Sequence, residues 1–292
     1  MNAITNSTSK VKKYASLVKF SHSIFALPFA ITGYFMAIFE YNYPFRWQDL
    51  IFVILCMVLA RNAAMGFNRY ADAAIDKENP RTAKREIPAG IIKRRHALWF
   101  VIINAVVFVA VCWFINPLVF FLSPLALLVV LGYSYTKRFT SLSHFVLGLG
   151  LAIAPTGAFL VVSGEFESLP VMLSGLVLLW TAGFDIIYAL QDEGFDQKKK
   201  LYSIPSMLGR KTALVISAIT HLGSLAFVVF IGFELDTEML YWIGAAIFAA
   251  LLTYQHIIVT PNNISRVNLA FGTMNGLASM VYAVFTIISM SI

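Results

Sequence analysis

Two carboxylates and an amide recur at every fourth position in the segment Asn68-Arg-Tyr-Ala-Asp72-Ala-Ala-Ile-Asp76. On an α-helix, four residues advance about 40° past a full turn, so these three side chains share one face within an arc of about 80°. Like charges at this spacing repel each other. A positive group is therefore expected against this face, and a divalent cation is the first candidate.

A second acidic segment, Asp185-Ile-Ile-Tyr188-Ala-Leu-Gln-Asp192-Glu-Gly-Phe-Asp196, has the same form. Its polar side chains also share one helical face at the end of an apolar run, and a basic loop again follows. Mg²⁺ binds through one or two carboxylates together with waters and phosphate oxygens of a substrate. Two such helix ends therefore predict a cage for a diphosphate that metal ions bridge.

Basic residues of the neighbouring loops complete the expected site. Arg81, Arg85 and Lys137 are candidates to neutralise the remaining diphosphate oxygens, with arginine favoured for its two-pronged geometry. A charged head group bound beside many apolar segments indicates an isoprenoid diphosphate. Metal binding makes diphosphate a better leaving group. The allylic carbon then becomes a cation that needs a nucleophile and protection from water, and a cavity inside a membrane would provide that protection.

The composition places these motifs in a membrane. Of the 292 residues, 59% are apolar and 13% are charged, whereas a soluble domain has about 45–50% and about 25%. Cys56 and Cys112 lie in apolar runs, which argues against a disulfide framework or a cysteine metal site. The net charge of +7 fits basic cytoplasmic loops rather than a nucleic-acid partner. We therefore expect an integral membrane protein embedded in a lipid bilayer.

Windows of about 20 residues predict an all-α bundle of about nine membrane-spanning helices. The predicted spans are 21–40, 49–71, 96–115, 117–136, 143–163, 170–192, 211–232, 239–259 and 267–289. Every second loop is basic, which places the N-terminus and both acidic segments in the cytoplasm and the C-terminus outside. The acidic segments leave the second and sixth spans, so we expect two four-helix repeats plus one helix. The whole chain, 1–292, is expected to be one membrane domain, with 1–12 disordered.

These motifs resemble the two signatures of the UbiA-type intramembrane prenyltransferase superfamily. Asn68–Gly90 is similar to the first signature and Asp185–Asp196 to the second. Tyr133–Thr140 resembles the family's loop after the fourth span. The resemblance covers nearly the whole chain, and Lys19–Phe29 resembles a bacterial subgroup described as 4-hydroxybenzoate polyprenyltransferase-like.

The resemblance implies Mg²⁺-dependent transfer of a polyprenyl group from its diphosphate to an aromatic ring, in a bacterial inner membrane. By motif matching, it implies that the metal and diphosphate ligands are Asn68, Asp72, Asp76, Asp192 and Asp196. It implies that Arg138 contacts the aromatic acid, and that Lys19 stands where many members carry a substrate-binding arginine. For the chemical step we expect Asp72 and Asp192 to act through the metal ions. Asp185 or Tyr188 is expected to orient the acceptor or to help remove its ring proton.

The identity of the acceptor stays open between two aromatic acids of quinone biosynthesis. 4-Hydroxybenzoate, on the ubiquinone route, is the first choice because a cation at Arg138 suits its carboxylate. A naphthoate, on the menaquinone route, is the alternative. A cation-coupled transporter also carries carboxylates in the membrane, but it would place them near the midplane rather than at helix exits beside basic loops. His144 is expected to have an ordinary packing or interface role, and the sequence specifies neither the prenyl chain length nor the oligomeric state.

Overall fold

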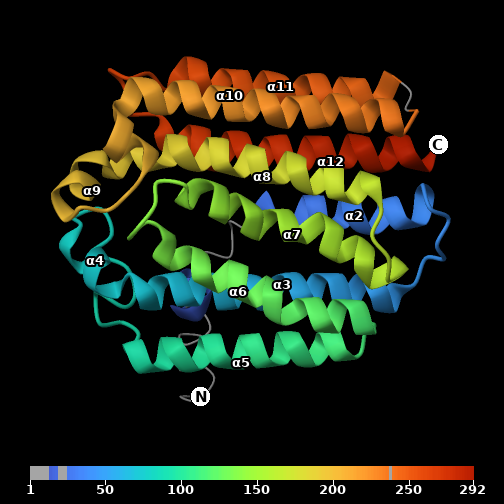
Figure 1. Ribbon diagram of the computed structural model, residues 1–292, viewed down its shortest axis with the longest axis horizontal. Coiled ribbons are helices and arrows are strands. Elements are labelled where there is room, and N and C mark those ends of the chain that lie inside the picture. The colour runs from blue at the N-terminus through green and yellow to red at the C-terminus, as the bar shows by residue number, and fades with distance from the viewer. Residues whose placement is uncertain (1–12, 19–24, 237–238) are drawn as a thin grey trace, which may run out of the picture.

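The computed structural model describes residues 13–18, 25–236 and 239–292. Within these ranges the chain folds into a bundle of helices without a β-strand (Figure 1). Its main elements are α2 (Leu27–Phe39), α3 (Trp47–Ala71), α4 (Ala73–Glu78), α5 (Arg94–Trp113), α6 (Pro117–Thr136), α7 (Ser143–Ser163), α8 (Ser168–Ala189), η2 (Leu190–Asp192), α9 (Glu193–Lys199), α10 (Ile204–Glu234), α11 (Met239–Ile258), η3 (Leu269–Met274) and α12 (Asn275–Ser291).

Eight segments of the described chain are long and apolar enough to cross a membrane, and α2 is a shorter apolar helix. This confirms the predicted all-α, multi-pass membrane bundle, with the count of nine as an approximation. The spans predicted at 117–136 and 143–163 coincide with α6 and α7. The first predicted span, 21–40, begins outside the described residues, and α2 occupies its later part.

The start of α10 also differs from the prediction, because this helix begins at Ile204 rather than near residue 211. Ser203 and Ser206 form a reciprocal capping box, and Pro205 occupies the first turn, where its missing N–H costs nothing. Gly209 then adopts a positive φ of 75° and breaks the helical path. The first turn of α10 is therefore a separate polar-capped piece, which a search for apolar windows does not detect.

Asn116 and Pro117 form the predicted tight hairpin between α5 and α6. Asn116 Oδ1 accepts a hydrogen bond from the Val119 N–H at 2.9 Å and caps α6. Its Nδ2 donates to the Leu160 carbonyl of α7 at 2.8 Å. One amide therefore caps the start of α6 and adds a second hydrogen bond to the Leu160 carbonyl, which also accepts one from the Gly164 N–H at 3.0 Å.

α7 packs closely against α2 on one side and α8 on the other. A Cβ atom added at Gly33 of α2 would lie 2.2 Å from the Pro155 carbonyl oxygen of α7, and one added at Gly148 of α7 would lie 2.4 Å from the Leu178 carbonyl oxygen of α8. Membrane helices gain packing energy from such close backbone approach. Of the eight candidate spans, the one that contains α8 is the most enclosed, with 56% of its apolar window buried. α8 is therefore the central helix.

Both acidic segments lie at the same end of the bundle. Figure 1 shows α4 and α9 together at one end and the C-terminus at the other. This common end is the condition for the two segments to form one site. The orientation of this end toward the cytoplasm and the two four-helix repeats stay predictions.

The close contact at Gly148 predicts a loss of stability in Gly148→Ala. The new methyl group would meet the Leu178 carbonyl oxygen, and overpacking of this kind costs about 1–3 kcal/mol. The matched control is Gly150→Ala in the same helix, where the added Cβ has its nearest neighbour, Val130 Cγ1, at 3.7 Å. We expect the thermal midpoint of purified protein in detergent to fall by several degrees for Gly148→Ala only. Equal midpoints for the two variants would contradict this packing.

Candidate active site

A cavity of about 1360 Å³ extends through one side of the bundle. Side chains of α3, α6, α7 and α8 form most of its wall, and both acidic segments line it. At the other extreme, Phe166 and Val171, near the start of α8, also belong to the lining. The cavity therefore joins a charged end to a long apolar interior.

The first acidic segment breaks its helix at Asp72. α3 ends at Ala71, and Asp72 has a φ of −90° and a ψ of 2° before α4 begins. The Asp72 N–H still donates to the Asn68 carbonyl at 3.0 Å, and the Asp76 N–H donates to the Asp72 carbonyl at 2.8 Å. Because these bonds keep the helical spacing, all three side chains line the cavity, as the pattern predicts. Asn68 Nδ2 also donates to Asp72 Oδ2 at 3.3 Å.

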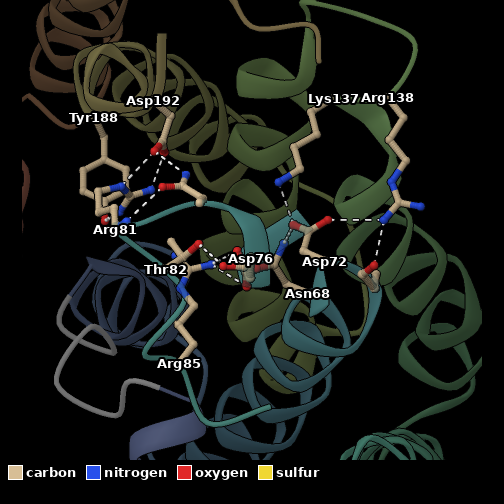
Figure 2. Close-up of polar contacts among 12 residues, drawn as sticks. Asn68, Asp72, Asp76, Arg81, Thr82, Arg85, Lys137, Arg138, Tyr188 and Asp192 are labelled. Atoms are coloured by element: carbon tan, nitrogen blue, oxygen red, sulfur yellow. Dashed lines mark hydrogen bonds and ion pairs between the residues drawn. The ribbon is translucent and has the colours of Figure 1, made fainter. Parts of the chain in front are cut away.

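Asp72 is only 1% exposed and has two cationic partners. Lys137 Nζ lies 2.7 Å from Asp72 Oδ2, and Arg138 Nη2 lies 3.3 Å from Oδ1 (Figure 2). A buried carboxylate would be costly without such partners. Lys137 lines the cavity. Arg138 is not among the described residues that form its lining. Arg138 instead donates to the Ala71 carbonyl at 2.7 Å and holds the end of α3; its contact with an aromatic acid stays a prediction.

Asp76 is bound by the loop that follows α4. Arg85 Nη1 donates to both of its carboxylate oxygens, at 2.7 and 2.8 Å. Thr82 Oγ1 donates to the Asp76 carbonyl at 3.1 Å. These bonds fold the basic loop back over the first acidic segment, so the predicted cations lie beside the predicted carboxylates.

The second acidic segment also interrupts its helix. α8 ends at Ala189, Leu190–Asp192 forms the 3₁₀ turn η2, and α9 follows. Asp185, Tyr188, Asp192 and Asp196 all line the cavity. Asp196 Oδ2 accepts a hydrogen bond from Ser203 Oγ at 3.0 Å. The predicted common face is thus present, although the backbone is not one continuous α-helix.

Arg81 connects the two acidic segments. Its Nε donates to Asp192 Oδ1 at 2.9 Å, its Nη2 forms an ion pair with Asp192 Oδ2, and its Nη1 donates to Tyr188 Oη at 2.9 Å (Figure 2). Asn79 Nδ2 donates to the same Asp192 Oδ1 at 2.9 Å. Burial lowers the pKa of Arg81, but the bonds to Asp192 and Tyr188 outweigh it and raise this pKa above its usual value. The two helix ends therefore face each other across one charged side chain.

Asp185 is oriented by His144 at the start of α7. His144 Nδ1 lies 2.7 Å from Asp185 Oδ2. His144 Nε2 accepts a hydrogen bond from the Ile204 N–H at 3.3 Å, so the proton of the neutral ring is on Nδ1 and is donated to Asp185. From the sequence alone, His144 is expected to have an ordinary packing or interface role. No spacing in the sequence connects it with Asp185, since the two residues lie on different helices.

The structure brings most of the predicted site residues to one cavity and adds others that the sequence analysis did not select. Those that line the cavity are Asn68, Asp72, Asp76, Arg81, Arg85, Lys137, Asp185, Tyr188, Asp192 and Asp196. Lys19 lies outside the described residues. Asn79, which donates a hydrogen bond to Asp192, stands directly before Pro80 and Arg81 in the first motif. Its position next to Arg81 is the feature of the sequence that could have identified it as a site residue.

The donor set fits magnesium that is bound together with a phosphate substrate. Among the described residues, no three His, Cys, Asp or Glu side chains are close enough to form a metal site of protein ligands alone. Mg²⁺ does not need such a cage, because one or two carboxylates, waters and phosphate oxygens complete its shell. The oxygen atoms of Asp72, Asp76 and Asp192 at the cavity mouth are ligands of this kind.

The fold is a polytopic helical bundle in which two acidic segments face each other at the mouth of a long apolar cavity, and it defines a class of multi-pass membrane proteins. Residues 26–279 match the model of the UbiA prenyltransferase family, and the chain belongs to this family. It is thus an integral membrane protein, and the predicted membership in this superfamily is confirmed.

Relatives from several organisms agree with this assignment. A protein of Photobacterium profundum named 4-hydroxybenzoate octaprenyltransferase is 31% identical over 211 residues, which are 72% of this chain and 73% of that protein. A protein of the same name from Aliivibrio fischeri is 29% identical over 236 residues, 81% of this chain and 82% of its own length.

Solved structures show the same fold. The apo structure of a UbiA homolog from Aeropyrum pernix K1 has a TM-score of 0.83 and 32% identity, and covers 92% of this chain and 98% of its own. The structure of a UbiA homolog from Archaeoglobus fulgidus bound to GPP and Mg²⁺ has a TM-score of 0.72 and 18% identity. The match covers 96% of this chain and 100% of that chain. At that identity the second likeness shows the fold alone.

The bridge through Arg81 predicts a local loosening in Arg81→Ala. Asp192 would keep its bond to Asn79 but lose both bonds to the guanidinium. We expect faster amide hydrogen exchange in peptides from 79–92 and from 190–200, because the two segments lose the Arg81 bonds and keep only the weaker Asn79 bond at Asp192. The control is Arg95→Ala, which removes an exposed arginine at the start of α5. Unchanged exchange in both peptides would show that Arg81 does not hold the segments together.

Proposed function

We propose that this protein transfers a polyprenyl group from a polyprenyl diphosphate to the ring of an aromatic acid, with Mg²⁺ as cofactor. The observation that carries the proposal is the pair of acidic segments that face each other at the mouth of one apolar cavity and are joined by Arg81 and Asp192. The charged end suits a diphosphate, and the apolar interior suits a prenyl chain. The names of the bacterial relatives support an aromatic acid as acceptor.

The cations at the mouth are able to change partners when a diphosphate enters. The side chains of Arg81, Arg85 and Lys137 are 29%, 22% and 33% exposed, whereas those of Asp72 and Asp76 are only 2% and 5% exposed. The cations therefore have room to turn toward diphosphate oxygens while the carboxylates stay in place. When bound, Mg²⁺ would neutralise charge on the leaving diphosphate. The carboxylates of Asp72, Asp76 and Asp192, with Asn68, would hold it, and Asp196 completes the same mouth.

The proposed reaction is an electrophilic aromatic substitution. The bond between the allylic carbon and the diphosphate oxygen breaks, and its electron pair leaves with the diphosphate. A ring carbon of the acceptor then forms a bond to the allylic carbon, and the ring proton departs. Asp185, which accepts a hydrogen bond from His144, is the candidate group to receive that proton or to orient the acceptor, with Tyr188 beside it. The membrane cavity excludes water, which would otherwise capture the cation.

The acceptor that we place first is 4-hydroxybenzoate. Its carboxylate requires a cation near the cavity, and Arg138, directly after Lys137 at the end of α6, is the candidate that the family resemblance implies. A naphthoate carries the same carboxylate on a larger ring system and is the second acceptor to be tested.

Replacing the carboxylates at the mouth should abolish transfer. We expect Asp72→Asn and Asp192→Asn each to lower the rate by at least about 100-fold at saturating Mg²⁺, because each removes a charge that would hold the metal and diphosphate. Glu78→Gln is the matched control, since this exposed carboxylate at the same end is paired only with Lys199 in the structure. Product formed by purified protein in lipid nanodiscs is the measurement. Near-normal rates in both aspartate variants would refute the metal role.

An acceptor panel tests the identity of the aromatic substrate. Membranes that contain the protein are incubated with Mg²⁺, a labelled polyprenyl diphosphate and either 4-hydroxybenzoate or a hydroxynaphthoate. We expect a labelled lipid whose mass equals acceptor plus prenyl group minus one hydrogen, with 4-hydroxybenzoate preferred. A preference for the naphthoate would change the acceptor but keep the chemistry. Absence of transfer to every aromatic acid would overturn the proposed function.

A further inference from the structure

A π-helix interrupts the chain directly before α12. The sequence predicts an ordinary span over 267–289, but Leu269–Met274 forms the π-helix η3 and the α-helix begins only at Asn275. π-Helical turns are rare, and they are frequent at functional sites because they redirect side chains. The residue that η3 places in the cavity is Phe271.

Asn275 holds η3 in place from the interior of the bundle. Its side chain is fully buried, and its Nδ2 donates to the carbonyls of Ala270 at 3.0 Å and Phe271 at 3.1 Å. Its Oδ1 accepts from Trp180 Nε1 at 3.0 Å and from Gln255 Nε2 at 2.8 Å. The amide thus uses both donors and both acceptor positions. Because every donor and acceptor of the Asn275 amide is used, these bonds fix the position of η3 relative to α8 and α11.

Phe271 belongs to a cluster of four rings that line the cavity. Its ring centroid lies 4.1 Å from that of Tyr188, 5.5 Å from that of Phe184 and 5.3 Å from that of Phe25. We call Phe25, Phe184, Tyr188 and Phe271 the aromatic cluster. Tyr188 connects this cluster to the charged mouth, because its Oη accepts a hydrogen bond from Arg81, which also binds Asp192.

The position of the cluster matches the place where positive charge would develop. The first carbon of a prenyl chain is bonded to the diphosphate, so it must lie next to the charged mouth, and Tyr188 borders that mouth. Ring faces attract cations, and they offer no lone pair that would capture a carbocation as water does. We propose that Phe271 is a catalytic residue that stabilises the allylic cation through its π face, and that Asn275 is its positioning residue. This inference rests on the proposed prenyl transfer.

Fluorinated phenylalanines at position 271 separate this role from simple packing. Fluorine withdraws charge from the ring face while the size of the side chain changes little. We expect kcat to fall with each added fluorine, by roughly 2- to 30-fold across the series, with KM for the prenyl diphosphate within about twofold. The measurement uses the full-length protein in nanodiscs with Mg²⁺, a polyprenyl diphosphate and 4-hydroxybenzoate. A flat series would overturn the catalytic role of Phe271.

A double-mutant cycle tests whether Asn275 acts through Phe271. Phe271→Leu and Asn275→Ala should each lower kcat by about tenfold, and the double variant should be little worse than either one, because both remove the same interaction. Asn104→Ala is the matched control: Asn104 is also buried and donates to the carbonyl four residues earlier, at 2.7 Å, but it lies away from the cavity on α5. Additive losses, or an equal loss in the control, would overturn the positioning role.

The same assays keep the two proposals apart. Wild-type protein that transfers the prenyl group but shows a flat fluorine series refutes the role of Phe271 and leaves the proposed function intact. Wild-type protein that transfers to no aromatic acid refutes the proposed function itself.

Discussion

The contact between Arg81 and Asp192 determines how this bundle closes at its charged end. Arg81 lies in the loop after α4, and Asp192 lies at the end of η2, so one side chain joins the two halves of the chain. Carboxylates near the membrane are costly unless a cation or hydrogen-bond donor meets them. Arg85 meets Asp76, Lys137 meets Asp72, and His144 meets Asp185 in the same way. These partners come from the loop after α4, the end of α6 and the start of α7. Satisfying the carboxylates therefore draws several separate parts of the chain to one mouth.

Both acidic segments interrupt their helices without losing their common face. Asp72 separates α3 from α4, and η2 separates α8 from α9. The Asp72 and Asp76 N–H groups still donate to the carbonyls four residues earlier, so the four-residue spacing of the side chains persists through the first break. The long helices supply the fixed frame, since the glycine contacts of α7 with α2 and α8 leave little freedom in the wall of the cavity.

The sequence was sufficient for the helices, for the two polar faces and for the set of cations beside them, because all three follow from periodicity and local charge. It was not sufficient to pair each cation with its carboxylate, since partners such as Arg81 and Asp192 are far apart in the chain. His144 and Asn79 escaped selection because their contacts depend on tertiary structure alone. The π-helix η3 was not predicted because a π-helix and an α-helix of the same apolar residues have the same hydropathy. The early start of α10 was not predicted for a related reason. Polar capping residues define this start, and a search for windows of apolar residues does not detect them.

Tyr188 is the point at which the charged and apolar halves of the site meet. Its hydroxyl group accepts a hydrogen bond from Arg81, and its ring packs against that of Phe271 with an interplanar tilt of 30°. An ionisation that leaves an anion and a carbocation requires the two environments to be adjacent but distinct. Cations and metal ligands must face the departing oxygen, while the carbon must face rings that cannot add to it. In this fold one residue borders both environments, and its two contacts come from opposite ends of the sequence, the loop after α4 and the π-helix before α12. In the proposed reaction this separation of charge depends on the tertiary structure, because the second acidic segment supplies Tyr188, whereas Arg81 and Phe271 reach it from other parts of the chain.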